Sequence, residues 1–351
     1  MQNLTSTGYA FTSAYLKGEE ARLITSEHVD RMLNATNIQG VLELIEDTDI
    51  GSYLGELTLM SFDDIDQSLW VYFGQCLALL EWFKMVPTEV LKILSAYKVK
   101  YDILNVKAAL WSIATGRRAS MIPLGIIQSY GLLDTLANAE KMGDIIESLT
   151  RCRLGNYAAI LKEYEQQLSE GARSRLQVDA RLDNEYYRNM LNSTRACPDA
   201  PLFSKAIGII IDLTNLQIIS RAIIEGMGLE VAEYTIGGGI MLSGETITEL
   251  LSLKLSDVPA RLADTQYWDA AESISSGYDR TKSIAVIAEI VETHKFRLVK
   301  EILAPRVLSP LMILYYLILK EAEIRNLRLI LKAMVDGIPL GETKKYMVLA
   351  S

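Results

Sequence analysis

Apolar residues recur along most of the chain at intervals of three and four, the spacing of one face of an α-helix. Pro87 and Gly116 bracket a long stretch of this kind, as expected for a helix that has proline in its first turn and glycine after its last. The stripe consists of Val90, Leu94, Tyr97, Tyr101, Leu104, Ala108 and Trp111. No comparable run alternates apolar and polar residues, and the cluster from Ile284 to Val291 lies among helix-favouring Ala, Glu and Lys. The pattern predicts an all-α fold.

The end of this helix is repeated twice further along the chain without a gap. The three copies read DILNVKAALWSIATG from Asp102, DLTNLQIISRAIIEG from Asp212 and EIRNLRLILKAMVDG from Glu323. Each copy has an acid first, Asn fourth and Gly fifteenth, and the copies start 110 and 111 residues apart. A proline precedes each copy, so we expect three long helices that begin near these prolines and end near the glycines. The positions are Pro87, Asp102, Asn105 and Gly116, then Pro201, Asp212, Asn215 and Gly226, then Pro310, Glu323, Asn326 and Gly337.

The spacing of the copies predicts three related helical modules of about 110 residues. The periodicity is interrupted at Gly116 to Arg118 and at Gly226 to Gly228. These breaks place the modules at 1–118, 119–229 and 230–351. Tandem modules of one kind form either a pseudo-threefold arrangement or an open solenoid, and the sequence is compatible with both.

The repeated acid and Asn lie on the same helical face as the shared aliphatic positions four, seven and eleven residues after the acid. A carboxylate or amide buried there must find hydrogen-bond partners, since an orphaned group costs ~1 to 3 kcal/mol. We interpret the pair as structural, tying each long helix either to a facing helix or to a loop backbone. The alternative, a catalytic acid with an orienting amide, requires the same chemistry three times in one chain. We therefore expect no catalytic, cofactor-binding or metal-binding residue.

Composition narrows the classes of protein. Half of the 351 residues are apolar, which suits a compact fold, and the net charge of −9 disfavours nucleic-acid binding. Cys76, Cys152 and Cys197 are far apart and form no C-x-x-C pair, which argues against a disulfide framework or a zinc site. Residues 1–18 are too polar for a cleavable signal, and the apolar stretch 307–319 is shorter than the ~20 residues of a spanning helix. Any membrane association is expected to run through a protein partner or the surface.

Other candidate chemistry is weak. The two histidines, His28 and His294, have no second ligand at metal-binding spacing, and we expect them to be solvated or near a helix cap. The glycine-rich segment 236–240 does not continue into Gly-Lys-Ser/Thr, so it reads as the loop that opens the third module. The acidic run 62–66 is similar to one aspartate-rich motif of isoprenoid synthases, but these need two facing clusters. A helix N-terminus explains that run better.

The three copies resemble the motifs of a known family, the C subunits of A-type and V-type ATP synthases, which are equivalent to the d subunit of the vacuolar ATPase. The segment 315–328, YYLILKEAEIRNLR, is similar to the C-terminal signature of that family. The segments 101–107 and 211–216 resemble its motifs in the first and second modules. The resemblance covers nearly the whole chain, and the order of the motifs agrees.

This resemblance implies a funnel-shaped, pseudo-threefold, all-helical adaptor without enzymatic activity or cofactor. Its partners would be the central rotor shaft subunits and the proteolipid subunits of the membrane rotor ring, on the cytoplasmic side of the membrane. Torque passed through the adaptor would serve proton or sodium transport. Two alternatives stay open: a helical-repeat protein-binding scaffold unrelated to ATPases, and a helical enzyme acting on lipid diphosphates with magnesium.

Overall fold

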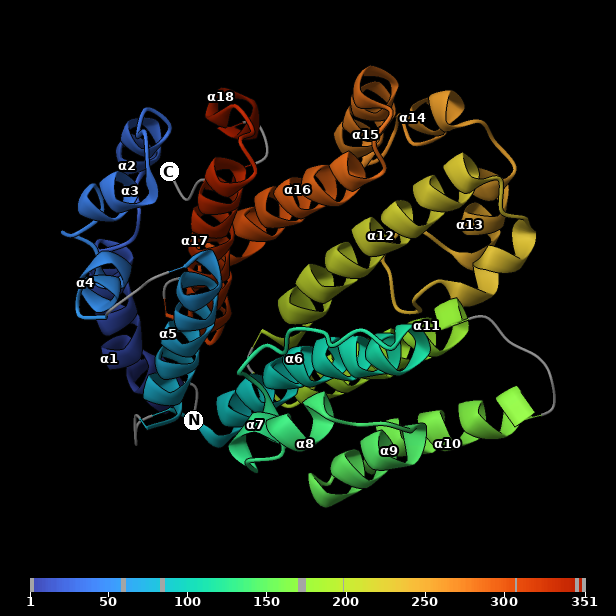
Figure 1. Ribbon diagram of the computed structural model, residues 1–351, viewed down its shortest axis with the longest axis horizontal. Helices are drawn as coiled ribbons and strands as arrows, with labels where there is room; N and C mark the ends of the chain where they lie inside the picture. The colour runs from blue at the N-terminus through green and yellow to red at the C-terminus, as the bar shows by residue number, and fades with distance from the viewer. Residues whose placement is uncertain are drawn as a thin grey trace. The chain divides into compact units, whose positions relative to one another are not determined.

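The structure is a computed structural model that describes residues 3–57, 61–82, 86–169, 175–197, 199–306, 308–344 and 347–348 (Figure 1). These residues form helices joined by turns and contain no strand, which confirms the predicted all-α fold. The first half of the chain contains α1 (Asn3–Glu20), α2 (Ser26–Met32), α3 (Ile38–Glu43), α4 (Asp49–Gly55), α5 (Phe62–Trp82), α6 (Thr88–Thr115), α7 (Ile126–Ser129), α8 (Leu133–Ala137), α9 (Met142–Arg151) and α10 (Gly155–Ser169). The second half contains α11 (Arg175–Thr194), α12 (Ala200–Glu225), the 3₁₀ turns η1 (Leu229–Tyr234) and η2 (Leu255–Asp257), α13 (Gly244–Leu251), α14 (Val258–Arg261), α15 (Trp268–Thr281), α16 (Ala285–Leu303), α17 (Leu311–Val335) and α18 (Leu340–Thr343).

The three long helices that carry the repeated motif are α6, α12 and α17. They begin within one residue of Pro87, Pro201 and Pro310, as the sequence predicts. They stop one or two residues before Gly116, Gly226 and Gly337, whose φ angles of 67°, 67° and 69° lie in the left-handed region. Glycine adopts this conformation at little cost, so it closes the last turn and redirects the chain into the next loop.

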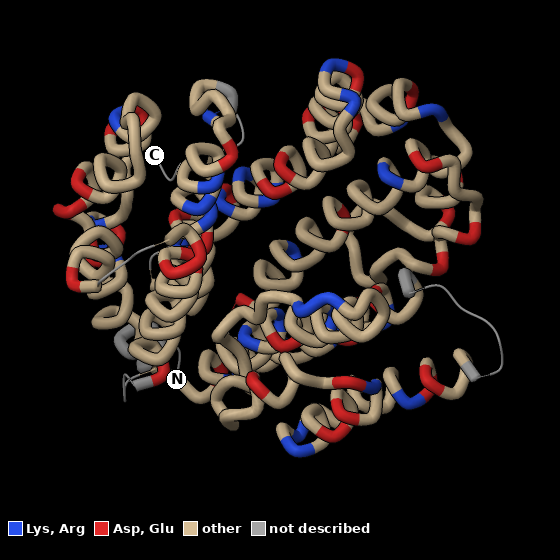
Figure 2. The backbone as a smooth tube through the Cα atoms, in the orientation of Figure 1, with Lys and Arg blue, Asp and Glu red and all other residues tan. Residues whose placement is uncertain are grey.

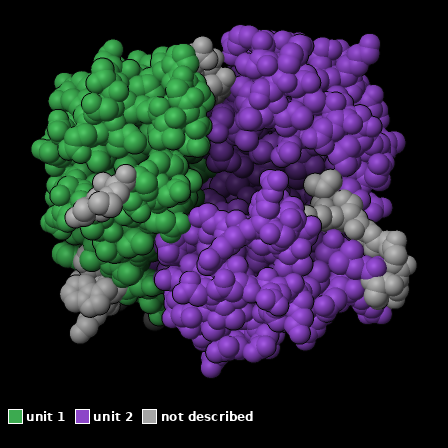
Figure 3. Space-filling view, in the orientation of Figure 1, with its two compact units in different colours: residues 1–91, 197–199, 296–351 green, residues 92–196, 200–295 purple. Residues whose placement is uncertain are grey.

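Contacts divide the chain into two compact units (Figure 3). Unit 1 comprises residues 1–91, 197–199 and 296–351, and unit 2 comprises residues 92–196 and 200–295. In unit 1, the two ends of the chain share one core, in which α17 packs against α1, α3, α5 and α18. In unit 2, α12 packs against α11, α13 and α15, and α10 packs against α9 and α11. The division into modules at residues 118 and 229 rests on the repeat and stays a prediction.

Among the described helices one, α12, is long and apolar enough to cross a membrane by length and composition alone. It does not stand out in the sequence, because Lys205, Asp212 and Arg221 interrupt its apolar residues. Most of its apolar window is buried within the fold, and it packs on α11, α13 and α15 of unit 2. These are the properties of the core helix of a compact unit.

Candidate functional site

The repeated acid and Asn are buried in all three long helices. Asp102, Asp212 and Asn215 are completely shielded from solvent, and Asn105, Glu323 and Asn326 are at most 5% exposed. We call each pair, together with the backbone that it binds, a clamp: the first clamp is on α6, the second on α12 and the third on α17.

The Asn side chain does the same thing in each clamp. Asn105 donates from Nδ2 to the carbonyl oxygen of Ile122 at 2.8 Å, and its Oδ1 accepts from the N–H of the same residue at 2.8 Å. Asn215 pairs in this way with Ile236, at 2.8 and 2.7 Å, and Asn326 with Val348, at 2.6 and 2.9 Å. The partner lies 17, 21 and 22 residues further along the chain. Each Asn therefore satisfies both backbone polar groups, the N–H and the carbonyl, of a single residue.

The aspartates of the first two clamps accept hydrogen bonds from backbone N–H groups that lie a few residues after the partner of the Asn. Asp102 accepts from Ile126 at 2.8 Å and from Ile127 at 2.9 Å. Asp212 accepts from the three consecutive residues 240–242 at 2.8 to 3.2 Å, and from the Tyr267 hydroxyl at 2.7 Å. Of the two partners that the sequence left open, a facing helix or a loop backbone, the structure shows the loop for each Asn and for Asp212, whereas Asp102 binds the first two N–H groups of the short helix α7.

A glycine allows each aspartate to approach its loop. A Cβ on Gly125 would lie 2.3 Å from Oδ1 of Asp102, and a Cβ on Gly239 would lie 1.9 Å from Oδ1 of Asp212. Real Cβ atoms do not come so close, and neither oxygen is free to move away, because each is held by hydrogen bonds. Gly125 also has a φ of 105°, which side chains rarely adopt.

The third clamp reaches a loop at the other end of the chain. Glu323 accepts through Oε1 from the N–H of Ile24, 299 residues earlier, at 2.8 Å. Its other oxygen accepts from Nζ of Lys320 at 3.2 Å, and the same ammonium donates to the Tyr72 hydroxyl at 2.9 Å. Lys320 is completely buried, so its charge is balanced inside unit 1 by Glu323.

Burial shifts the proton affinity of two of these carboxyls. Burial raises the pKa of Asp102 to about 7. Hydrogen bonds from the N–H groups of Ile126 and Ile127 and the charge of Lys98 act in the opposite direction and lower the pKa. Burial also raises the pKa of Glu323, an effect opposed mainly by Lys320. The first clamp thus holds its negative charge with backbone dipoles, whereas the third uses a buried cation.

Several residues of the clamps were not found from the sequence. Tyr72 and Tyr267 carry no local signal, because their partners are distant in the chain, and the spacing of Lys320 and Glu323 is that of an ordinary surface ion pair. Asn184 on α11 was also missed: it donates to the carbonyl of Thr235 at 3.1 Å and accepts from the N–H of Gly237 at 2.8 Å. Of the two glycines, Gly239 stood out only as part of a glycine-rich loop and Gly125 did not stand out at all, although Gly-Ile follows the motif in both unit 2 copies, at 125–126 and 239–240.

The remaining candidates lie outside the clamps. His28 caps α2, where its Nδ1 contacts the N–H of Thr25 at 3.1 Å. His294 is buried 3.4 Å from the Ser273 hydroxyl, so the expectation of a solvated or capping histidine is wrong there. The acidic run opens α5, as expected, with Asp64 accepting from the N–H of Ser61. Within the described ranges, no three His, Cys, Asp or Glu side chains lie close enough together to hold a metal ion.

The geometry of the clamps favours holding over reacting. Their carboxyl oxygens are shielded from solvent and already accept hydrogen bonds, so a substrate in solution has no access to them in this conformation. What the three clamps do is fix a long helix to a loop that is remote in sequence, with both partners desolvated.

Comparison with known proteins agrees with this picture. The chain is similar to the A-type ATP synthase C subunit of Methanocaldococcus jannaschii, at 24% identity over 97% of this chain and 86% of that protein. It is also similar to the proteins of the same name from Methanococcoides burtonii, at 28% identity over 96% and 93%, and Thermococcus kodakarensis, at 23% over 97% and 90%. A family model described as ATP synthase (C/AC39) subunit matches residues 12–346. This match argues against a scaffold unrelated to ATPases and against a lipid-diphosphate enzyme: the chain belongs to the ATP synthase (C/AC39) subunit family.

Proposed function

We propose that this protein is a non-catalytic adaptor of the central stalk of a rotary A-type ATP synthase. It links the rotor shaft to the membrane rotor ring and transmits torque between them, in support of proton or sodium transport. It is peripheral, on the cytoplasmic side of the membrane, and is held there by protein partners. The family to which the chain belongs supports the complex, and the three clamps support the mechanical role within it.

The clamps are the single observation that favours a mechanical part. An adaptor that carries torque must resist sliding of its helices, and α6, α12 and α17 are each fixed to a loop by buried hydrogen bonds. Breaking one of these bonds inside the fold leaves polar groups without water to replace their partners. Side chains locked in this way give stiffness without any requirement for reactive groups.

The test is affinity purification of the tagged chain from native membranes, with the bound chains identified by mass spectrometry. We expect the subunits of the rotor shaft and the proteolipid ring in a fixed ratio to the tagged chain. A complex assembled without the chain should hydrolyse ATP but no longer couple hydrolysis to ion transport. Recovery of the catalytic head alone, or normal coupling without the chain, would contradict the proposal.

A second measurement separates an adaptor from a nucleotide-binding subunit. We expect titration calorimetry of the isolated chain with magnesium ATP to show no heat of binding, and the chain to have no ATPase activity. Micromolar binding of ATP would show that the protein has a chemical role of its own.

A further inference from the structure

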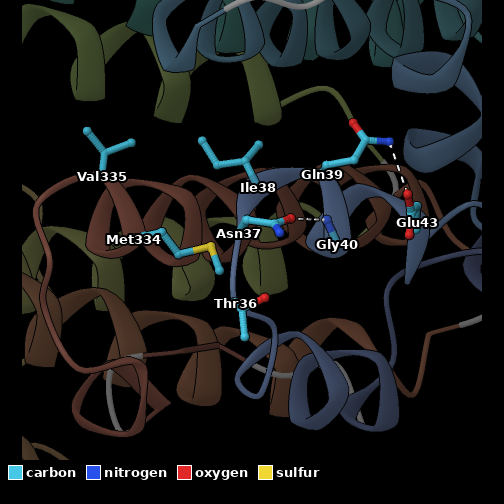
Figure 4. A pocket seen from close by; sticks show the side chains of 8 residues that line it. All are labelled: Thr36, Asn37, Ile38, Gln39, Gly40, Glu43, Met334 and Val335. Carbon is cyan, nitrogen blue, oxygen red and sulfur yellow. Dashed lines mark hydrogen bonds between the residues drawn. The ribbon is translucent and has the colours of Figure 1, made fainter.

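An open groove lies along α3 on the surface of unit 1, away from the clamps. Its first part has a volume of about 650 Å³ and lies between α3 and the end of α17 (Figure 4). Ile38, Met334 and Val335 supply its apolar surface, and Val335 is 51% exposed. An apolar side chain that is so exposed beside a hollow leaves free energy to be gained from a partner that covers it.

The groove continues on the other side of α3. A second hollow of about 380 Å³ shares Ile38, Gln39 and Glu43 with the first, so the two are adjacent along one helix. Leu42, Leu54, Leu57 and Ile65 line this second part, and Leu57 is 37% exposed. The combined groove is therefore an elongated surface with apolar residues along its length.

The charge around the groove has a single sign. Residues 32–83 contain no Lys or Arg but nine acids, and the other 35 acids of the chain are balanced by its 35 Lys and Arg. The whole net charge of −9 thus resides in this segment. Figure 2 shows the acidic positions along α3, α4 and the start of α5. The nine are Glu43, Glu46, Asp47, Asp49, Glu56, Asp63, Asp64, Asp66 and Glu81.

Two of these acids line the groove itself. Glu43 is shared by both hollows and Glu46 belongs to the second, and both side chains are exposed. Glu43 accepts a hydrogen bond from Gln39 at 3.3 Å, and no Lys or Arg of the described segments forms an ion pair with either glutamate. By contrast, Asp49 and Asp66 pair with Arg22 and Arg328. The groove therefore offers two exposed carboxylates that are available to basic side chains of a partner.

We propose that the groove along α3 docks a basic amphipathic helix of a partner protein. An apolar stripe on that helix would cover Ile38, Leu57 and Val335, while Lys or Arg on its flanks would pair with Glu43 and Glu46. A helix suits the site because its own backbone is satisfied internally, and no strand edge is available in the described chain to extend an incoming strand. The groove and its charge are features of the chain by itself, so this docking does not rest on the proposed function.

The probe is a fluorescein-labelled peptide of about 18 residues, ~27 Å long as a helix, with Leu along one face and Lys on both flanks. Binding to the full chain is followed by fluorescence anisotropy at low and high salt. We expect micromolar affinity, about tenfold weaker binding of a peptide with Glu in place of Lys, and weaker binding as salt rises. A scrambled peptide of the same composition that binds equally well would overturn the proposal, since only charge would then matter.

Variants of the chain test whether the peptide binds at the groove along α3. The double variant Glu43→Gln with Glu46→Gln should bind the Lys peptide about threefold to tenfold more weakly, which is the range expected for the loss of two exposed ion pairs. Val335→Gln should weaken binding of the Lys peptide by a similar factor, because it removes an apolar contact and leaves the charge unchanged. The matched control is Glu245→Gln with Glu272→Gln, two exposed acids of unit 2, which should leave the affinity unchanged. Since all these side chains are exposed, the variants should fold; equal affinity for all of them would refute docking at α3.

Discussion

In the first and third clamps the Asn binds the N–H and the carbonyl of one residue, but the two clamps bury their acids in different ways. In the first clamp, Asp102 has two backbone N–H groups as its ligands. In the third, Glu323 has one N–H group and a buried ammonium, that of Lys320. The Asn of each clamp pairs in the same way with the N–H and the carbonyl of one residue, whether in unit 1 or unit 2. The amide is thus the constant part of the motif, and the acid is the part that adapts to its surroundings.

The length of the acid goes with the residue that precedes its N–H donor. The two aspartates face Gly125 and Gly239, where no Cβ would fit, and both glycines are followed by Ile. The glutamate also bonds the N–H of an isoleucine, Ile24, but the residue before it is Leu23. The longer acid is thus the one whose N–H donor follows leucine rather than glycine.

The largest effect is expected where a buried charge would lose its partner. Lys320→Met keeps the volume of the side chain but leaves Glu323 with one N–H ligand and no cation. Breaking a buried ion pair costs ~3 to 5 kcal/mol, so unit 1 should unfold at a much lower urea concentration. Lys332→Met on the same helix is the control, because Lys332 is 54% exposed and its pair with Asp336 contributes little. Similar midpoints for the two variants would mean that Glu323 does not depend on the ammonium.

The second prediction concerns the close approach of an aspartate to its loop. Gly239→Ala would place a Cβ against a carboxylate that is held by four hydrogen bonds, and overpacking of this kind costs ~1 to 3 kcal/mol or more. We expect Gly239→Ala to lower the free energy of unfolding, measured by chemical denaturation, by at least ~2 kcal/mol. Gly55→Ala is the control, because nothing lies within 4 Å of its Cβ and its backbone is helical. If Gly239→Ala is as stable as Gly55→Ala, the glycine is not what admits the acid.

The third prediction tests the constant part of the motif. Replacing Asn105, Asn215 or Asn326 with Leu leaves a buried N–H and a buried carbonyl without partners, at a cost of ~1 to 3 kcal/mol in each case. The three losses should be similar, and, if the proposed function is right, binding to the rotor shaft should weaken along with stability. The control is Asn138→Leu, since the amide of Asn138 donates to a carbonyl at an exposed helix end. An Asn215→Leu protein that is fully stable and binds its partners would contradict the structural role.

Much of this arrangement was predictable from the sequence because it depends on short-range physics. Helical period, proline and glycine placed α6, α12 and α17, and the buried face carrying Asp212 and Asn215 required partners. The identity of those partners was not predictable, because a loop and a facing helix both satisfy an amide. The donor to Glu323 lies 299 residues away, and nothing near either residue marks the other.

Charge was the least predictable part of the structure. The sequence has Lys320 three residues before Glu323, a spacing that on most helices signals an exposed ion pair. Here the pair is buried, because α5 supplies Tyr72 as a second acceptor for the ammonium. Sequence periodicity reports which face of α17 is apolar, but it does not report what a neighbouring helix places against a charged residue on that face.

The smallest expected effect is the pH dependence that Asp102 contributes through the first clamp. Because burial raises the pKa of Asp102 from 3.8 to about 7, the folded protein binds this proton more tightly than the unfolded chain. The resulting stability is fully present below about pH 4 and is lost as pH rises through 7, by about 1 kcal/mol between pH 6 and pH 8. Asp102→Asn cannot titrate, so its free energy of unfolding should fall less over that interval than that of the unaltered chain, even though its overall stability is lower. Asp134→Asn, at an exposed site in unit 2, should keep the original slope. Identical slopes in urea titrations of all three proteins would mean that Asp102 is ionised across this range, and that its two N–H donors offset the cost of burying the charge.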